Sequence, residues 1–142
     1  MGLKRLMYLL LQLTWGVAQN VVGLLCFLWT LITGRGRSVR LFHGAVVTNW
    51  TLRSSMGMGL FVFFGHGRSA RAREILVHEY GHTLQSAALG PLFLPLVGVP
   101  SLLWAAAYGP RRRRKGSSYY DFYTEKWASA WGEKSTGEKA AR

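Results

Sequence analysis

The sequence predicts a mainly α-helical fold with a small β-hairpin, an α+β domain carrying an N-terminal transmembrane helix. The length of 142 residues suits one folded unit, residues 1–142, rather than two. A long apolar run lies near the N-terminus, and the chain changes from strand-forming to helix-forming residues near Ser69. Nearly half of the residues are apolar, yet the net charge is +12. This pairing is typical of a membrane protein with basic flanks, so membrane lipids are the first expected partner.

The N-terminal apolar run, residues 7–33, is long enough to span a bilayer as one helix. Lys4 and Arg5 before it resemble the start of a signal peptide, but the run is longer than the apolar region of such a peptide. Three amides interrupt it, at Gln12, Gln19 and Asn20. Because buried amides need partners, we expect one side of this helix to pack against the rest of the chain.

A β-hairpin is expected over residues 39–64, with Val39–Trp50 and Met58–Phe64 as its strands and a turn between them. A helix is expected over residues 69–90, with Ser69 as a candidate N-cap. The following segment, residues 91–109, is apolar but contains several glycines and prolines. We therefore expect kinked or re-entrant helices there rather than a straight span. The tail, residues 132–142, has the composition of a disordered segment.

The sequence His-Glu-Tyr-Gly-His at residues 78–82 is the feature that carries chemistry. Histidines four residues apart lie on one face of a helix, so His78 and His82 can bind one zinc ion. Glu79 would then lie near the open coordination position, where it can act as general base and acid. Gly81 is expected to leave room beside the metal for water or substrate.

A catalytic zinc ion usually has three protein ligands, so one further residue is needed. The residues alone leave several candidates open: His43, His66, Asp121, Glu125 and Glu133. The metzincin continuation is excluded, because Gln85 and Ala88 stand where its glycine and third histidine belong. The single cysteine, Cys26, excludes a disulfide framework and a cysteine-based zinc site.

Over residues 58–131 the pattern resembles the gluzincin branch of HExxH zinc metallopeptidases. The resemblance implies that a downstream helix, residues 118–131, supplies Glu125 as the third ligand. Ser129 stands where that branch has an acidic residue four positions further on, so this chain departs from the pattern at the residue that supports the histidines. The HEYGH run with its Leu-Gly-Pro-Leu and Phe-Tyr-Thr-Glu-Lys-Trp-Ala segments also looks like small bacterial membrane proteins, a likeness that implies no substrate.

The gluzincin resemblance further implies an edge strand that pairs with an extended substrate, for which Met58–Phe64 is the candidate. A core strand with no substrate role is an equal alternative, because apolar alternation in this segment is weak. Candidate donors to a developing oxyanion share a position near the predicted helices: His66, Tyr119, Tyr120 and Tyr123.

The sequence therefore predicts a membrane-associated zinc hydrolase that cleaves a peptide or protein substrate. The alternative is a non-catalytic membrane scaffold with a structural or vestigial zinc site. A third possibility is lipid or nucleic-acid binding through the basic cluster Arg111–Lys115, although its place after an apolar segment favours lipid, and no nucleic acid is expected. Basic residues on both sides of residues 87–108 indicate that this segment does not cross the membrane, and that the site faces the cytoplasm at a bacterial inner membrane.

Overall fold

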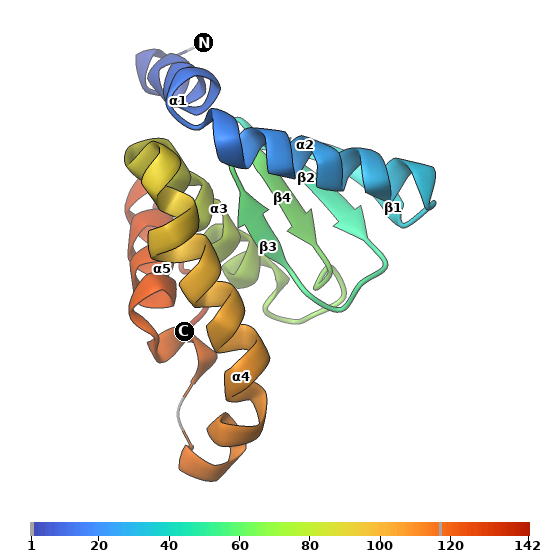
Figure 1. Cartoon of the computed structure of the whole chain (residues 1–142), viewed down its shortest axis with the longest axis vertical. Helices are drawn as coiled ribbons and strands as arrows, with labels where there is room; N and C mark the ends of the chain where they lie inside the picture. The colour runs from blue at the N-terminus through green and yellow to red at the C-terminus, as the bar shows by residue number, and fades with distance from the viewer. Residues whose placement is uncertain (1, 117) are drawn as a thin grey trace.

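The computed structural model describes residues 2–116 and 118–142, without the side chains of residues 108–115. It is mainly helical with a small mixed four-stranded sheet, which confirms the α+β class (Figure 1). The α-helices are α1 (Leu3–Thr14), α2 (Val17–Ile32), α3 (Ala72–Leu89), α4 (Val99–Lys115) and α5 (Tyr123–Thr136). The strands are β1 (Gly36–Phe42), β2 (Ala45–Trp50), β3 (Met56–Met58) and β4 (Phe61–Phe64).

The single transmembrane helix expected over residues 7–33 is replaced by two helices, α1 and α2, that meet at an angle of 87°. The break falls at Trp15 and Gly16, where the indole of Trp15 packs against Gly90 at the end of α3. Among the described residues, no single helix combines the length and the hydropathy that a membrane crossing requires, whereas the bent α1–α2 pair does so jointly.

The three amides of this region face the protein interior, as expected. Gln12 donates to the carbonyls of Gly59 and Thr83 at 3.0 and 2.8 Å. Gln19 donates to the carbonyls of Ser86 and Gly90, and the side-chain oxygen of Asn20 accepts from the amide of Leu60. These bonds attach α1 and α2 to the C-terminal half of α3 and to the loop before β4, because a buried amide is stable only when it is paired.

The sheet has the order β1-β2-β4-β3 and differs from the hairpin that the sequence predicted. Val39–Trp50 is not one strand, because a two-residue turn at His43 and Gly44 divides it into the antiparallel pair β1 and β2. β4 then pairs with β2 in parallel and with the short β3 in antiparallel, so β4 is interior and β3 forms an edge. The candidate edge strand therefore lies at residues 56–58, and only Met58 of the predicted segment Met58–Phe64 belongs to it.

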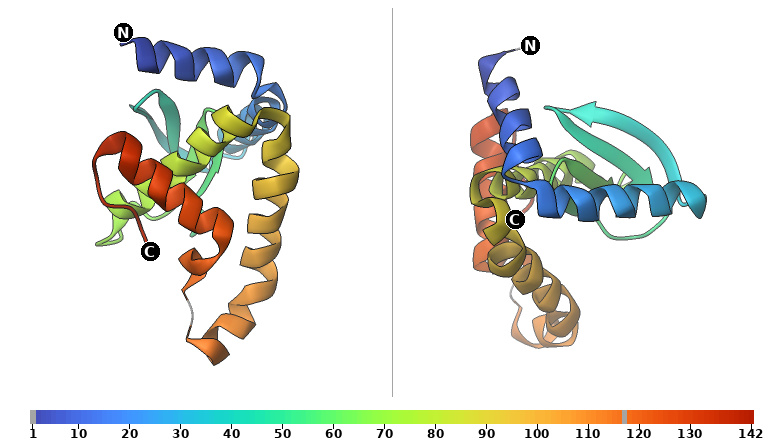
Figure 2. Two further views of the ribbon diagram at one scale, coloured as in Figure 1. Left: turned by 90° about the vertical axis from the view of Figure 1, so that its left-hand side faces the viewer. Right: turned by 45° about the horizontal axis from the view of Figure 1, so that its top comes forward.

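Both faces of β4 are covered, which explains its weak apolar alternation. Val62 and Phe64 belong to the core cluster that includes Leu76 and Tyr80 of α3. On the opposite face the ring of Phe61 lies 5.8 Å from that of Phe27 in α2. The sheet is thus packed between α3 and α2, and α5 lies on the other side of α3, as the left view in Figure 2 shows.

Helices α3 and α5 approach closely because glycines stand at their contact. A methyl group on Gly81 would lie 1.8 Å from the carbonyl oxygen of Ala128, and one on Gly132 would lie 2.2 Å from that of Val77. Gly81 therefore faces α5. The sequence had predicted that it leaves room beside a metal, and the structure differs from this prediction. This contact sets the separation between the HEYGH motif and the helix that carries Glu125.

The segment after α3 is kinked, in agreement with its glycines and prolines: a 3₁₀ turn at Gly90–Leu92 and a π-helical stretch at Leu94–Gly98 lead into α4. Ser69 does not cap α3, which begins at Ala72; its hydroxyl instead accepts from the amide of Arg71. A 3₁₀ turn at Tyr119–Asp121 precedes α5. The side chains of the predicted basic cluster, Arg111–Lys115, are not among those that the structure describes.

The tail also differs from the disordered segment that its composition predicted. Helix α5 continues to Thr136, and Ala140 and Ala141 are fully buried. The amide of Ala141 donates to the carbonyl of Glu74 in α3, and Arg142 pairs with Glu133 at 2.7 Å. Small side chains and paired charges hold this segment against the two helices, which amino-acid composition does not reveal.

Candidate metal centre

Helices α3 and α5 bring one ligand atom from each of His78, His82 and Glu125 to within 4.8 Å of the others. One carboxylate oxygen, Oε2 of Glu125, lies 3.0 Å from Nε2 of His78 and 3.3 Å from Nε2 of His82. All three side chains are buried. This group could hold a metal ion, and of the open candidates for the third position the structure brings Glu125 to the two histidines.

The hydrogen bonds of His78 leave its Nε2 free to bind a cation. The Ser129 hydroxyl donates its only proton to the carbonyl of Ala141 at 2.7 Å. It must therefore accept from Nδ1 of His78, which lies 2.9 Å away. The proton of the neutral ring then sits on Nδ1 and the lone pair of Nε2 points toward Glu125. Burial lowers the pKa of His78 to about 4, which keeps the ring neutral.

His82 is oriented in the same way by Gln85. The amide nitrogen of Gln85 donates to the carbonyl of Thr124 at 3.1 Å, so its oxygen faces Nδ1 of His82 at 2.8 Å and accepts the proton there. Nε2 of His82 is then directed at the shared carboxylate oxygen. In the neutral rings, two nitrogen lone pairs thus converge on a carboxylate, an arrangement that is stable only with a positive charge between them.

Glu125 is held as a carboxylate. Burial by itself would raise its pKa, but the imidazoles of His78 and His82 beside the carboxylate outweigh burial and move the pKa well below its ordinary value. Its other oxygen, Oε1, accepts from the hydroxyl of Thr124 at 3.2 Å. Burial raises the pKa of the Tyr119 hydroxyl, and the nearby charges of Glu125 and Glu79 raise it further.

Glu79 lies one residue from His78 on α3 and faces the edge strand. Burial raises the pKa of Glu79 to about 7, although the nearby His82 and the backbone of Gly57 in β3 act to lower it. A methyl group on Gly57 would lie 2.5 Å from the backbone carbonyl oxygen of Glu79, so glycine permits β3 to lie directly on this turn of α3. The carboxyl group is therefore fixed beside the three ligand side chains.

A cleft of about 700 Å³ opens onto this group between β3 and α4. Glu79, His82 and Glu125 form part of its wall. Since this cleft connects the buried side chains to the exterior, a ligand of several residues could reach the metal-binding atoms through it.

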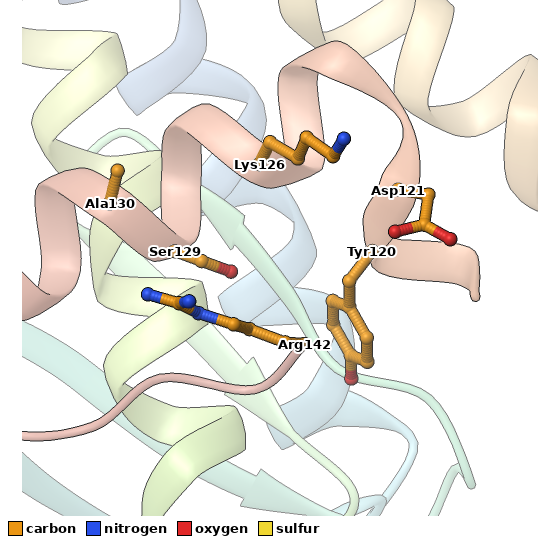
Figure 3. Close-up of a pocket in the computed structure, with 6 residues that line it drawn as sticks. All are labelled: Tyr120, Asp121, Lys126, Ser129, Ala130 and Arg142. Carbon is orange, nitrogen blue, oxygen red and sulfur yellow. The ribbon is translucent and has the colours of Figure 1, made fainter.

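A second, smaller pocket of about 230 Å³ lies beside Ser129, between α5, the turn before it and the tail (Figure 3). Its lining residues come from these three segments: Tyr120, Asp121, Lys126, Ser129, Ala130 and Arg142. The tail thus lies next to the residue that orients His78. Tyr120 borders both this pocket and the large cleft.

The other candidate ligands from the sequence lie elsewhere. His43 occupies the β1–β2 turn with φ of 49°, and His66 bonds to the Ser55 hydroxyl at 2.7 Å. Asp121 accepts from the amide of Ser118, and Glu133 binds the tail. Of the candidate oxyanion donors, Tyr119, Tyr120 and His66 border the cleft. The Tyr123 hydroxyl is turned away and donates to the carbonyl of Leu96.

Two groups that support the site were not found from the sequence. Gln85 follows His82 by three residues and thus shares its helix face, a spacing that could have identified it. The carbonyl of Ala141 carries no such signal, since any residue at that position would supply it. Ser129 was noted as a departure from the gluzincin pattern, and its hydroxyl accepts from Nδ1 of His78.

Comparisons with protein-family models, with curated proteins and with solved structures find no match.

Proposed function

We propose that this protein is a zinc-dependent hydrolase that cleaves peptide bonds at a membrane, with a site of the gluzincin kind. The observation that supports it most is the convergence of two imidazole nitrogens and one carboxylate oxygen, each of whose side chains is oriented by a further hydrogen bond. Nitrogen and carboxylate ligands in this combination suit zinc, and three protein ligands with an open cleft are typical of a catalytic site rather than a closed structural one.

Bound zinc would supply a Lewis acid that activates water and polarises the substrate carbonyl. The carboxylate of Glu79 would take a proton from the attacking water and deliver it to the nitrogen of the leaving amine. One water is consumed, the carbonyl carbon gains an oxygen, and the C–N bond breaks to give an acid and an amine. The pKa of about 7 for Glu79 suits a group that accepts and then donates a proton near neutral pH. Tyr119, which borders the cleft beside Glu125, would donate to the developing oxyanion.

Membrane association is supported by the reversed polarity of α1 and α2. Their buried positions include Gln12, Gln19 and Thr30. The outward faces carry large apolar side chains: Leu10, Leu13, Val21, Leu24, Leu25, Leu28 and Leu31. Exposing such a surface to water is unfavourable, so we propose that α1 and α2 insert it into a bilayer with anionic lipids, which the net charge of +12 favours.

The scaffold alternative has its own support, because His78 and Glu125 join α3 to α5 and a metal there would fasten the two helices. The cleft that reaches Glu79 favours catalysis. The first test is the zinc content of the protein purified in detergent, compared with His78→Ala and Glu125→Ala. We expect about one zinc ion per chain, lost in both variants and retained in the control His43→Ala. Zinc-free wild-type protein after metal-replete purification would remove the basis for the proposal.

A further inference from the structure

The large cleft is bordered by two different kinds of wall. Its inner end carries Glu79, His82 and Glu125, the side chains of the candidate metal centre. One side is the edge strand β3, and the other side is the start of α4 with the π-helical stretch before it. Figure 1 shows α4 running down beside β3, while α2 crosses the upper end of the sheet.

The α4 wall of the cleft is also outer surface. Leu102 and Val99 border the cleft, yet they are 70% and 51% exposed. They continue outward into further exposed apolar side chains on the segment before α4: Leu92 and Leu96. The interior of the cleft is therefore continuous with an exposed apolar surface.

The β3 wall adjoins apolar surface as well. Met56 and Met58 border the cleft, and the carbonyl oxygen of Met58 would lie only 2.8 Å from a methyl group on Gly23 of α2. The outward face of α2 beyond this contact is apolar, with Leu24 and Leu28 exposed. Arg53 borders the cleft too and brings a positive charge to it.

Leucine side chains around the cleft are unfavourable in contact with water, as they would be if the substrates were water-soluble peptides. Contact with lipid or with an apolar segment removes this unfavourable exposure. An apolar segment lying in the bilayer beside α4 can move into the cleft without crossing water. Arg53 can at the same time attract a carboxylate or lipid phosphate at the end of such a segment.

We propose that the substrates of this site are membrane-embedded apolar segments of other proteins, which enter the cleft sideways from the bilayer between α4 and β3. This inference rests on the proposed function, since it names the substrate class of the same site. Leu102 is the specificity-determining residue on the α4 wall, and it contacts the apolar side chains of the substrate.

The test uses the zinc-loaded full chain in vesicles of phosphatidylcholine and phosphatidylglycerol. One probe is a fluorescent leucine–alanine peptide of about 20 residues, long enough to span the bilayer. The other is a water-soluble peptide of equal length. We expect kcat/KM for the apolar probe to exceed that for the soluble probe at least tenfold. Leu102→Asp should lower kcat/KM for the apolar probe about tenfold or more, through KM. The control Leu103→Asp, at an equally apolar position that is 61% exposed and about 100° further round the helix, should change it less than about twofold.

Faster cleavage of the soluble probe, or equal effects of the two substitutions on kcat/KM for the apolar probe, would overturn the inference. The proposed hydrolase function would not be affected by either result. If neither probe is cleaved, binding of the apolar probe is measured by fluorescence anisotropy in detergent micelles. Weaker binding by Leu102→Asp than by Leu103→Asp would then support the substrate class while the hydrolase fails. No binding by the wild-type chain, or equal binding by both variants, would overturn it.

Discussion

The Ser129 hydroxyl lies 2.9 Å from Nδ1 of His78, although the two residues are 51 positions apart in the chain. Through the same oxygen the site is joined to the tail, because Ser129 donates to the carbonyl of Ala141. The orientation of His78 thus depends on three segments: α3, α5 and the last residues of the chain. A histidine held in this way presents one fixed nitrogen to a cation.

Removal of this hydroxyl should weaken metal binding. We expect Ser129→Ala to lower the zinc affinity about 10- to 100-fold, because His78 loses the acceptor that fixes its proton on Nδ1. Competition with a fluorescent zinc chelator measures the change. Thr136→Ala is the matched control, since it removes a hydroxyl from the same helix that bonds only to backbone groups. Equal affinities of Ser129→Ala and the wild type would show that Ser129 does not orient the ligand.

Glu79→Gln distinguishes an enzyme from a scaffold. The amide keeps the size of the side chain but cannot take a proton from water, so hydrolysis of a fluorogenic peptide library should fall about 10²- to 10⁴-fold. Zinc content and thermal unfolding should stay as in the wild type, because Glu79 is not among the three grouped ligand residues. Glu74→Gln, an acid on the same helix paired with Arg71, is the control and should retain activity. Undiminished hydrolysis by Glu79→Gln would favour the scaffold.

The HEYGH helix could be anticipated from helical spacing, whereas Glu125 was chosen among five candidates only through the resemblance to the gluzincin pattern. The structure places Glu125 next to His78 and His82 through a glycine contact between α3 and α5. That contact could not be predicted, since Gly81 had an equally reasonable role beside a metal. Which face a glycine turns toward a neighbour depends on the packing of both helices.

Two errors in the fold can be traced to particular residues. His43 and Gly44 both have positive φ, at 49° and 101°, and make a two-residue turn inside what reads as one strand. Histidine is an uncommon residue at such a position, so the turn gives little signal. At Trp15 and Gly16 the apolar run contains no proline or charge, and the bend arises from packing of Trp15 on Gly90. The turn is a local feature with a weak sequence signal, whereas the bend depends on a contact between residues distant in sequence.

Gly81→Ala should destabilise the protein. Alanine normally favours a helix by up to about 1 kcal/mol relative to glycine. Here its methyl group would lie 1.8 Å from the carbonyl oxygen of Ala128, so α3 and α5 must separate. We expect the free energy of unfolding to fall by about 1–3 kcal/mol, measured by thermal and chemical unfolding in detergent. Gly67→Ala is the control, because a methyl group there meets only the Phe64 ring at 4.0 Å. Increased stability of Gly81→Ala would contradict the close helix contact.

The affinity for zinc should depend on pH through His82. Burial lowers the pKa of His82, but hydrogen bonding to Glu125 and the charges of Glu125 and Glu79 outweigh it, so the pKa lies above its ordinary value of 6.5. Below this raised pKa the metal-free site holds a proton on His82 that zinc must displace, whereas above it no proton competes. The association constant should therefore be constant at high pH and fall about tenfold per unit as the pH drops below the pKa of His82. Since the pKa of His78 is about 4, that ring should release no proton between pH 7 and pH 5. Glu79, whose pKa is about 7, lies beside the site and can release a proton as well, so the protons are counted on Glu79→Gln by calorimetry in buffers of different ionisation enthalpy, where at most one per ion is expected. Release of two protons by this variant, or an affinity that does not change over this range, would contradict the assignment of the proton to His82.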